Sequence, residues 1–481
     1  MSDVLLKHHT LYIGGEWTDG DRDVIQVVNP ATEQIIAEVP SASIADADAA
    51  VEAAARLHEA GTWARATFRD RADVLDRIAD ALEARSADLL RVYVDDLGGP
   101  TSLAAFVNGL SVQVFRHTAE IARTLEDTPE TRHGSGAPVV LRKVPVGPVL
   151  ASVPWNAPLL LLAVKASAAL AAGCPVICRA DEQAPLASFC FAEAVASLDL
   201  PAGLVSVLPA GVEVSKHLVS HPGVRHISFT GSTAVGKEVM RAAAQHLTRV
   251  TLELGGKSAA IVLDDLDPSA VSSLYLGCLA QTGQICTTYS RVLVPESQLN
   301  EWTVALTEFF TSLPIGDPWD PQTMVGPLAS GKQRATVERY VDIAREEGTV
   351  VAGGRRPAQL DHGFYYEPTL VTGVARDSRI AQEEVFGPVV VIMGYKDVDD
   401  AVQIANGTDY GLAAGIFTND LARAELLAPR LRAGAVSINN FGANMQECFG
   451  GLGASGFGRE GGREGIEELL EVTQLQYPAQ F

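Results

Sequence analysis

The stretch PVGPVLASVPWNAPLLLLAVKASAALAAGCPVICR, residues 145–179, decides the fold class. Its valine-rich start predicts a buried strand, the apolar run that ends at Gly173 predicts a buried helix, and PVICR predicts a second buried strand. The apolar run contains Lys165 and is too short to cross a bilayer. The segment therefore indicates a strand–helix–strand unit with parallel strands, covered by helices.

The same alternation continues downstream. PLASFCFAEAVASL (185–198) predicts a helix, LVSVL (204–208) a strand, and HISFTG (226–231) another strand after a further helix. Ser232 follows directly and is predicted to cap the helix in STAVGKEVMRAAAQHL. A helix that starts at the end of a parallel strand favours anions, so we expect a nucleotide-binding domain up to about Glu253.

The flanking regions have other patterns. After a hairpin-like N-terminal stretch, residues 44–60 and 68–94 predict two amphipathic helices, because apolar residues recur every three or four positions. GAPVVLRKVPV (136–146) predicts an extended ribbon. A second α/β region is expected to about residue 450, and ELLEVTQLQYP (468–478) predicts a short β-rich tail.

Composition excludes several classes of protein. The 481 residues are 47% hydrophobic and 20% charged, as in ordinary globular proteins, and the net charge of -22 disfavours nucleic acid and anionic membrane surfaces. The N-terminus lacks the pattern of a secretory signal, which predicts a cytoplasmic protein. The six cysteines form no CxxC pair and no zinc-like spacing with histidine, so we expect neither disulfides nor a metal site.

The motif G-x-G-x-x-G occurs at residues 451–456, in GLGASG. Only 25 residues follow it, no clear strand precedes it, and no acidic residue follows at the spacing of a dinucleotide site. We therefore interpret it as a glycine-rich loop.

Four other stretches carry chemistry when taken together: VPWNAP (153–158), TLELGGKS (251–258), GQICTT (283–288) and EEVFGP (383–388). Each alone is more typical of a structural turn, a strand end or a packed thiol. Oxidation of an aldehyde through a thioester needs a thiol, an oxyanion donor that does not titrate, and a carboxylate that activates water. Cys286, Asn156 with the Cys286 N–H, and Glu253 match these three needs, with a nicotinamide as hydride acceptor.

These stretches, with VNPATEQIIAEVP (28–40), FTGSTAVGK (229–237) and FGGLGASGFGRE (449–460), resemble motifs of the NAD(P)-dependent aldehyde dehydrogenase superfamily in family order over nearly the whole chain. The resemblance implies an α/β fold with a Rossmann-like cofactor domain, an α/β catalytic domain and a β-ribbon that pairs subunits. The implied borders are 1–122 and 143–254 for the cofactor domain, 255–450 for the catalytic domain, and 123–142 with 451–481 for the ribbon and tail.

The resemblance also implies roles for individual residues. Cys286 matches the nucleophile, Asn156 the oxyanion donor and Glu253 the general base, while Lys165 and Glu460 match positions that relay the base's proton. The positions that match cofactor contacts are Trp155, Arg179, Glu182, Gly231, Ser232, Glu384 and Phe386, of which Ser232 lies at the pyrophosphate, Glu384 at the nicotinamide ribose and Phe386 at the nicotinamide.

Two departures from the family pattern concern the cofactor. Arg179 replaces the lysine that usually contacts the adenosine ribose, and Ser215 stands where a glycine is common. Glu182 is retained, and a carboxylate beside the ribose accepts from its 2′-hydroxyl and repels a 2′-phosphate. We therefore predict NAD, with NADP as the alternative, since an arginine tolerates a phosphate.

The resemblance also suggests the substrate. Three positions of the implied aldehyde tunnel, where family members that act on small aldehydes often have bulky aromatics, carry the small residues Ala157, Val164 and Ala280, which predicts a branched, cyclic or aromatic aldehyde. Leu161 and Ile285 are expected to form an apolar wall of the pocket, and Phe441 and Phe449 to lie near its mouth. The exposed ribbon predicts a homodimer or homotetramer. Two alternatives are a CoA-acylating semialdehyde dehydrogenase, whose relatives lack the glutamate base, and a non-catalytic descendant that only binds the cofactor.

Overall fold

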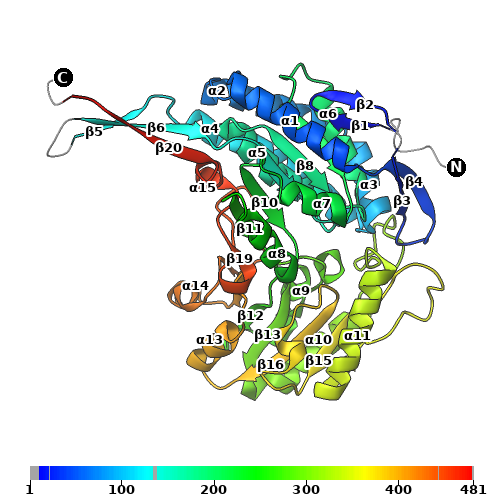
Figure 1. Cartoon of the computed structure of the whole chain (residues 1–481). Helices are drawn as coiled ribbons and strands as arrows, with labels where there is room; N and C mark the ends of the chain where they lie inside the picture. Colours follow the sequence, from blue (N-terminus) through cyan, green and yellow to red (C-terminus); the bar gives the residue numbers. More distant parts are fainter. Residues whose placement is uncertain (1–9, 21, 134–137, 443, 479–481) are drawn as a thin grey trace.

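The computed structural model describes residues 10–20, 22–133, 138–442 and 444–478. Figure 1 shows two helix-covered sheets, one above the other, and a long ribbon that projects sideways from the upper one. The start of the predicted N-terminal stretch (1–9), the first residues of the predicted ribbon (within 134–137) and the last residues of the tail (479–481) lie outside the described residues.

The upper sheet contains the predicted strand–helix–strand units. Its strand order is β19-β11-β10-β7-β8-β9-β1-β2, and the five strands from β11 to β9 are parallel. The central strands are almost fully buried because helices cover both faces. The strands are β1 (Leu11–Ile13), β2 (Glu16–Thr18), β7 (Val149–Ser152), β8 (Val176–Ala180), β9 (Val205–Pro209), β10 (His226–Thr230), β11 (Arg249–Glu253) and β19 (Gly456–Phe457).

The helices of this part agree with the sequence prediction in most places. The predicted helix over 44–60 is present, and Gly173, in the left-handed conformation, ends the buried helix as expected. The helices are α1 (Ile44–Ala60), α2 (Phe68–Glu83), α3 (Ser86–Leu97), α4 (Thr101–Arg123), α5 (Pro158–Ala172), α6 (Leu186–Ala196), α7 (Val212–Val219), α8 (Thr233–Ala243) and α15 (Gly462–Glu467).

Two predictions about helices were incomplete. The helix expected over 68–94 is divided into α2 and α3, with Arg85 outside helical geometry at φ −103° and ψ 16°. At this break the Arg85 guanidinium binds Glu193 of α6 at 2.6 Å. The long helix α4, which packs against α2 and α5, was not predicted, because its buried face mixes polar residues such as Asn108 and Ser111 with apolar ones.

The lower sheet has the order β14-β15-β16-β13-β12-β17-β18, and all its strand pairs are parallel except β14–β15. This confirms the second α/β region. Its strands are β12 (Ser258–Val262), β13 (Tyr289–Pro295), β14 (Thr349–Ala352), β15 (Thr369–Thr372), β16 (Val389–Tyr395), β17 (Ala413–Phe417) and β18 (Ala435–Ile438). Its α-helices are α9 (Tyr275–Leu279), α10 (Leu299–Ser312), α11 (Gly331–Glu347), α12 (Arg379–Gln382), α13 (Val398–Asn406) and α14 (Leu421–Leu427).

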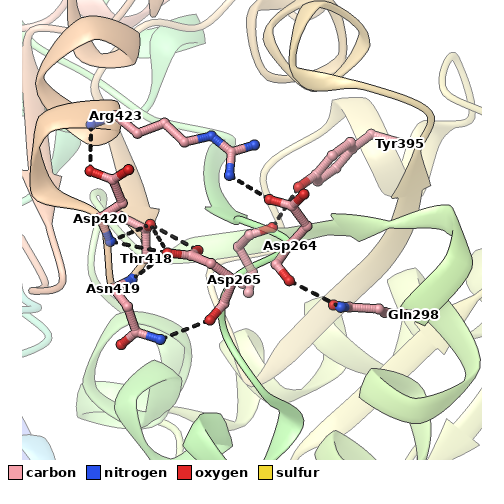
Figure 2. A network of polar contacts seen from close by, with 9 residues as sticks. Asp264, Asp265, Gln298, Tyr395, Thr418, Asn419, Asp420 and Arg423 are labelled. Atoms are coloured by element: carbon pink, nitrogen blue, oxygen red, sulfur yellow. Dashed lines mark hydrogen bonds and ion pairs between the residues drawn. The ribbon is translucent and has the colours of Figure 1, made fainter.

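A polar network joins the ends of β12 and β17 to the start of α14 (Figure 2). The Asp265 carboxylate accepts hydrogen bonds from the Thr418 hydroxyl and from the backbone N–H groups of Asn419 and Asp420, at 2.8–3.0 Å. Nearby, Arg423 pairs with Asp264. A carboxylate that accepts several N–H and O–H donors holds a turn tightly, so this network fixes the ends of β12 and β17 relative to the start of α14.

The ribbon is a three-stranded antiparallel sheet of β5 (Glu130–Arg132), β6 (Val139–Pro145) and β20 (Leu470–Gln476), so the predicted ribbon and tail pair with each other. Val472 is 61% exposed on it. A separate hairpin consists of β3 (Val24–Val28) and β4 (Ile35–Pro40). Among the described residues, none of the helices has the length and apolar character needed to span a membrane. The domain borders stay predictions.

Candidate active site

The segment that carries Cys286 has an unusual backbone. Gln281 and Thr282 have φ values of 51° and 57°, and Gly283 follows at 71°, so three consecutive residues are left-handed. The Tyr93 hydroxyl of α3 contacts the Gln281 side-chain oxygen at 2.6 Å, and the Thr282 hydroxyl donates to the Gly326 carbonyl at 3.0 Å. These contacts hold a conformation that a β-branched residue such as Thr282 otherwise avoids.

The Cys286 side chain is half-buried where this segment leads into β13. Gly256 lies against it so closely that a Cβ on this glycine would be 2.5 Å from the Cys286 carbonyl oxygen. Burial raises the pKa of the thiol to about 12, and the negative charges of Glu384 and Glu253 add to the rise. The thiol is therefore protonated at neutral pH in the protein without ligands.

Asn156 reaches the same segment from the other side. It is buried, it lies between β7 and α5, and its Nδ2 donates to the Gln284 carbonyl at 2.9 Å, two residues before the cysteine. An amide nitrogen has two N–H donors, so one remains for a further acceptor. The structure thus brings Asn156 and the cysteine segment together.

Glu253 is the last residue of β11, and its side chain is buried. Neither carboxylate oxygen has a donor in good hydrogen-bonding geometry among the residues described, although the Gly451 N–H is close enough to oppose a pKa rise. Burial, and then the charge of Glu460, raise the pKa of Glu253 well above its usual range. The raised pKa favours the neutral carboxylic acid, and solvation of the buried side chain would favour the carboxylate.

Lys165 and Glu460 form a buried ion pair behind this carboxylate. The Lys165 Nζ is 2.6 Å from Glu460 Oε1 and donates to the Ser228 hydroxyl at 3.0 Å, and Ser228 in turn donates to the same Glu460 oxygen. The pair therefore links α5, β10 and the chain before α15. Ser228 was not predicted, because its importance depends on the pairing of β10 beside α5 and not on its neighbours in the sequence.

At the end of β10, the predicted cap is confirmed. The Ser232 hydroxyl accepts from the Val235 N–H at 3.4 Å, and the Gly231 N–H donates to the Glu253 carbonyl at 3.0 Å. The start of α8 thus lies beside the end of β11, where an anion would meet the positive end of the helix.

Arg179 lies within β8, one residue before its end, and Glu182 lies two residues after the strand. The Ser41 hydroxyl donates to Glu182 Oε1 at 3.1 Å, and a Cβ on Gly211 would be 2.8 Å from Glu182 Oε2, so the carboxylate lies over the start of α7. The Arg179 guanidinium donates to the Ala210 carbonyl at 2.6 Å and to Asp181 at 3.3 Å. Arg179 is thus engaged within the protein.

Glu384 lies near Cys286 and contacts the Gly255–Gly256 segment that follows Glu253. Its Oε1 accepts from the Gly256 N–H at 2.9 Å, and burial raises its pKa to about 7. Phe386 has a positive φ of 57°, and its ring meets Trp155 edge-on at 5.4 Å. The structure therefore joins Trp155, Glu384 and Phe386, from three separate stretches, near the cysteine segment.

The predicted pocket residues are placed less uniformly. Leu161 and Val164 are buried on α5 in the core of the upper part, while Phe441 packs against the Tyr289 ring at 5.7 Å and Phe449 forms a two-way backbone pair with Glu460. Ala280 is buried and Ile285 half-buried in the cysteine segment.

Ala157 differs from the other six pocket positions. It lines a cavity of about 10 Å³ between α3, α4 and α5, together with Asp96 and Asn108. Among the residues that line this cavity, none of the other six positions occurs. A joint aldehyde pocket of all seven residues stays a prediction.

Two further residues were missed by the sequence interpretation. Lys257 is buried next to the Gly255–Gly256 pair, and burial lowers its pKa to about 7, with the nearby Glu384 charge opposing this. In the GLGASG loop, the Ser455 carbonyl accepts a hydrogen bond from the Leu254 N–H at 3.0 Å, and the Ser455 hydroxyl donates one to the Gly255 carbonyl at 2.7 Å. The loop therefore holds the backbone directly after Glu253 in place, a role that its glycine spacing does not predict.

Known proteins are similar to this chain over almost its whole length. A family model described as the aldehyde dehydrogenase family matches residues 17–475. Geranial dehydrogenase of Castellaniella defragrans is 38% identical over 466 residues, which cover 96% of this chain and 97% of that protein.

Solved structures agree with this match. The crystal structure of betaine aldehyde dehydrogenase from Staphylococcus aureus in complex with NAD+ has a TM-score of 0.96 at 33% identity, covering 99% of this chain and 96% of that one. Aldehyde dehydrogenase of Mycobacterium tuberculosis complexed with NAD+ has a TM-score of 0.95 at 38% identity, covering 98% of this chain and 99% of that one. The predicted fold class and the resemblance are confirmed, and the chain belongs to the aldehyde dehydrogenase family.

Proposed function

We propose that the protein oxidises an aldehyde to the carboxylic acid with NAD+ through a covalent thioester on Cys286. The observation that carries the proposal is the convergence of a half-buried thiol, an amide donor and a buried carboxylate from separate parts of the chain. The charge of Glu253 raises the pKa of Cys286, and Asn156 donates a hydrogen bond to the backbone carbonyl of Gln284, two residues before Cys286.

In this mechanism the Cys286 thiol gives its proton to solvent and the sulfur adds to the aldehyde carbon. The resulting oxyanion accepts hydrogen bonds from the free Nδ2–H of Asn156 and from the Cys286 N–H, which do not titrate and so stay donors throughout. When bound, NAD+ takes the hydride that leaves the thiohemiacetal carbon. Water then attacks the thioester, Glu253 takes its proton, and the carbon–sulfur bond breaks to release the acid and restore the thiol.

Proton transfer depends on the buried groups behind Glu253. Because its pKa is raised, Glu253 loses its proton with difficulty, but a carboxylate of high pKa is also a stronger base once ionised. Lys165 and Glu460 lie next to it and are proposed to pass its proton onward. Ser228 holds both groups of this pair in place.

The surroundings of the cofactor residues support NAD over NADP. Glu182 is held by Ser41 at the start of α7, where it would accept from an adenosine ribose hydroxyl and repel a phosphate. Arg179 donates to Ala210 and Asp181, so its charge is partly satisfied within the protein. Glu384 would accept from the nicotinamide ribose, with Trp155 and Phe386 beside the ring and Gly231 and Ser232 at the pyrophosphate.

For the substrate we propose a bulky apolar, cyclic or aromatic aldehyde. The small side chains of Ala157, Val164 and Ala280 support this, and so does the name of one relative, geranial dehydrogenase, which denotes a branched apolar aldehyde. Each additional buried methylene group would contribute roughly 0.8 kcal/mol to binding.

The test is NADH formation from a panel of aldehydes, with and without CoA, by the wild type and by Cys286→Ala. We expect activity that does not require CoA, a free acid as product, and complete loss of turnover in Cys286→Ala with NAD binding retained. An acyl-CoA product formed only with CoA would support the acylating alternative. NAD binding without turnover of any aldehyde in the wild type would support the non-catalytic one.

A further inference from the structure

A cluster of two histidines and an aspartate lies outside the proposed active site, between α1 and α7, which pack against each other in the upper part (Figure 1). Asp48 belongs to α1, His217 to the last turn of α7, and His221 follows two residues after that helix ends. Their potential ligand atoms all lie within 4.8 Å of one another. Nothing in the proposed oxidation of an aldehyde uses these groups.

We propose that Asp48, His217 and His221 form a Zn²⁺ site that ties α1 to α7. Two imidazoles and a carboxylate are a common ligand set for zinc, and the turn after α7 brings His221 back beside His217, so that both rings face Asp48. The C-terminal end of α7 also carries partial negative charge, which favours a cation there.

The distances between the side chains fit a tetrahedral ion. Asp48 Oδ1 is 2.6 Å from His217 Nε2 and 3.4 Å from His221 Nε2. Ligand atoms bound to zinc at about 2.0–2.1 Å in tetrahedral geometry lie about 3.3 Å apart. The Asp48–His221 separation is already of this size, the Asp48–His217 contact must lengthen, and the ligand nitrogens of the two rings, which lie within 4.8 Å of each other, adjust by rotation of the partly exposed side chains.

The tautomer of His221 would change on binding. The Gly223 N–H donates to His221 Nδ1 at 3.0 Å, so the neutral ring carries its proton on Nε2, which faces Asp48. Zinc binding at Nε2 requires that this proton leave Nε2 and that Nδ1 take up a proton from solvent, so Nδ1 no longer accepts from the Gly223 N–H, which must turn to solvent. Gly223 is half-buried in a surface turn, and water can take over this hydrogen bond.

The site is open to solvent and has room for a fourth ligand. The His217, His221 and Asp48 side chains are 32%, 19% and 42% exposed, so an ion can reach them. Glu52 lies one helical turn after Asp48 on α1, and its charge acts on His221. Glu52 or water would complete the four ligands that zinc takes in most protein sites.

The experiment measures zinc binding by the untagged, EDTA-washed full chain. Because accessible thiols also bind zinc, the parent for the measurement is Cys286→Ser with Cys448→Ser, the two cysteines that are not buried. We expect about one Zn²⁺ per chain by elemental analysis after dialysis, and a rise in Tm on addition of zinc. His217→Ala with His221→Ala should weaken binding by at least about 100-fold, since loss of ligands costs more than the 10–100-fold typical of outer-shell partners.

The matched control is His246→Ala with His362→Ala, which removes two exposed histidines elsewhere. This control should bind zinc as the parent does. Asp48→Asn should also weaken binding while keeping the shape of the side chain, and far-UV circular dichroism of the metal-free variants checks that they fold. The proposal is overturned if the parent binds no stoichiometric zinc at micromolar concentration, or if the His217–His221 variant binds it equally well.

Discussion

The reactivity of Cys286 in the enzyme without NAD gives a quantitative test of the active-site electrostatics. The pKa of about 12 lies three pH units above the ordinary thiol value of 9.0, so at pH 8 the thiolate is about 1,000-fold scarcer than in a normal cysteine. A thiolate of higher pKa is more nucleophilic, with a Brønsted coefficient of about 0.4–0.5, which restores roughly 16- to 32-fold. Exchange with a dipyridyl disulfide should therefore be about 30- to 60-fold slower than for a normal thiol.

The pH dependence separates this effect from steric shielding. In a Cys448→Ser background, where the remaining cysteines other than Cys286 are buried, the rate should rise about tenfold per pH unit from pH 8, where Glu384 is ionised, to pH 10 without levelling off. Steric shielding alone lowers the rate by the same factor at every pH, so the rate would still level off near the pKa of an ordinary thiol. A plateau with an apparent pKa below about 8 would refute the reasoning.

Glu384→Gln provides the matched variant. The charge of Glu384 is the second cause of the raised thiol pKa, and its own pKa of about 7 means that it is charged at pH 9 and mostly neutral at pH 6. The variant should therefore react faster than the parent at pH 9 and equally at pH 6. Equal rates at both pH values would show that burial alone controls the thiol.

Four further expectations concern the reaction, the cofactor, the substrate and the assembly. Glu253→Gln should slow steady-state turnover while a pre-steady-state burst of NADH persists; loss of the burst would mean that Glu253 acts before hydride transfer. The wild type should have the higher kcat/KM with NAD, and Glu182→Ala should narrow the preference; a wild type that prefers NADP contradicts this. Ala157→Phe should lower kcat/KM for cyclic or branched aldehydes more than for acetaldehyde, which should be a poor substrate of the wild type; unchanged values would remove Ala157 from the pocket. Light scattering at micromolar concentration should give a dimer or tetramer, because the exposed ribbon would otherwise leave open pairing edges, and a monomer would contradict this.

Sequence patterns predicted the elements whose local signals agree with their surroundings. The buried strands and α5 are continuous apolar runs, Gly173 ends α5 in the left-handed conformation, and Ser232 caps α8, so short-range rules suffice. Helix α4 escaped because Asn108 and Ser111 interrupt its apolar face, and these residues are buried only after α2 and α5 have packed against it.

The candidate site shows the same division. Cys286, Asn156 and Glu253 could be proposed because a single reaction needs all three chemical types. The hydrogen bonds of Ser228 could not, since they join β10 to α5 and to Glu460, which is 232 residues away in the sequence. The raised pKa values of Cys286 and Glu253 also depend on burial and on charges from distant segments, which no local pattern encodes.

The left-handed turn before Cys286, the proposed nucleophile, makes the position of this thiol depend on the contact between the upper and lower parts of the protein. Gln281 and Thr282 each pay about 1–2 kcal/mol for their conformation, and part of what holds them is the Tyr93 hydroxyl from a helix of the upper part. A fragment that contains only the lower sheet would carry the sequence GQICTT without this support. Its turn would relax toward ordinary backbone angles, and the cysteine would lose its alignment with Asn156 before the lower sheet itself unfolded. In the proposed mechanism, catalysis therefore requires that the interface between the two sheets stays closed, and we expect loss of activity to be the earliest sign that this interface has opened.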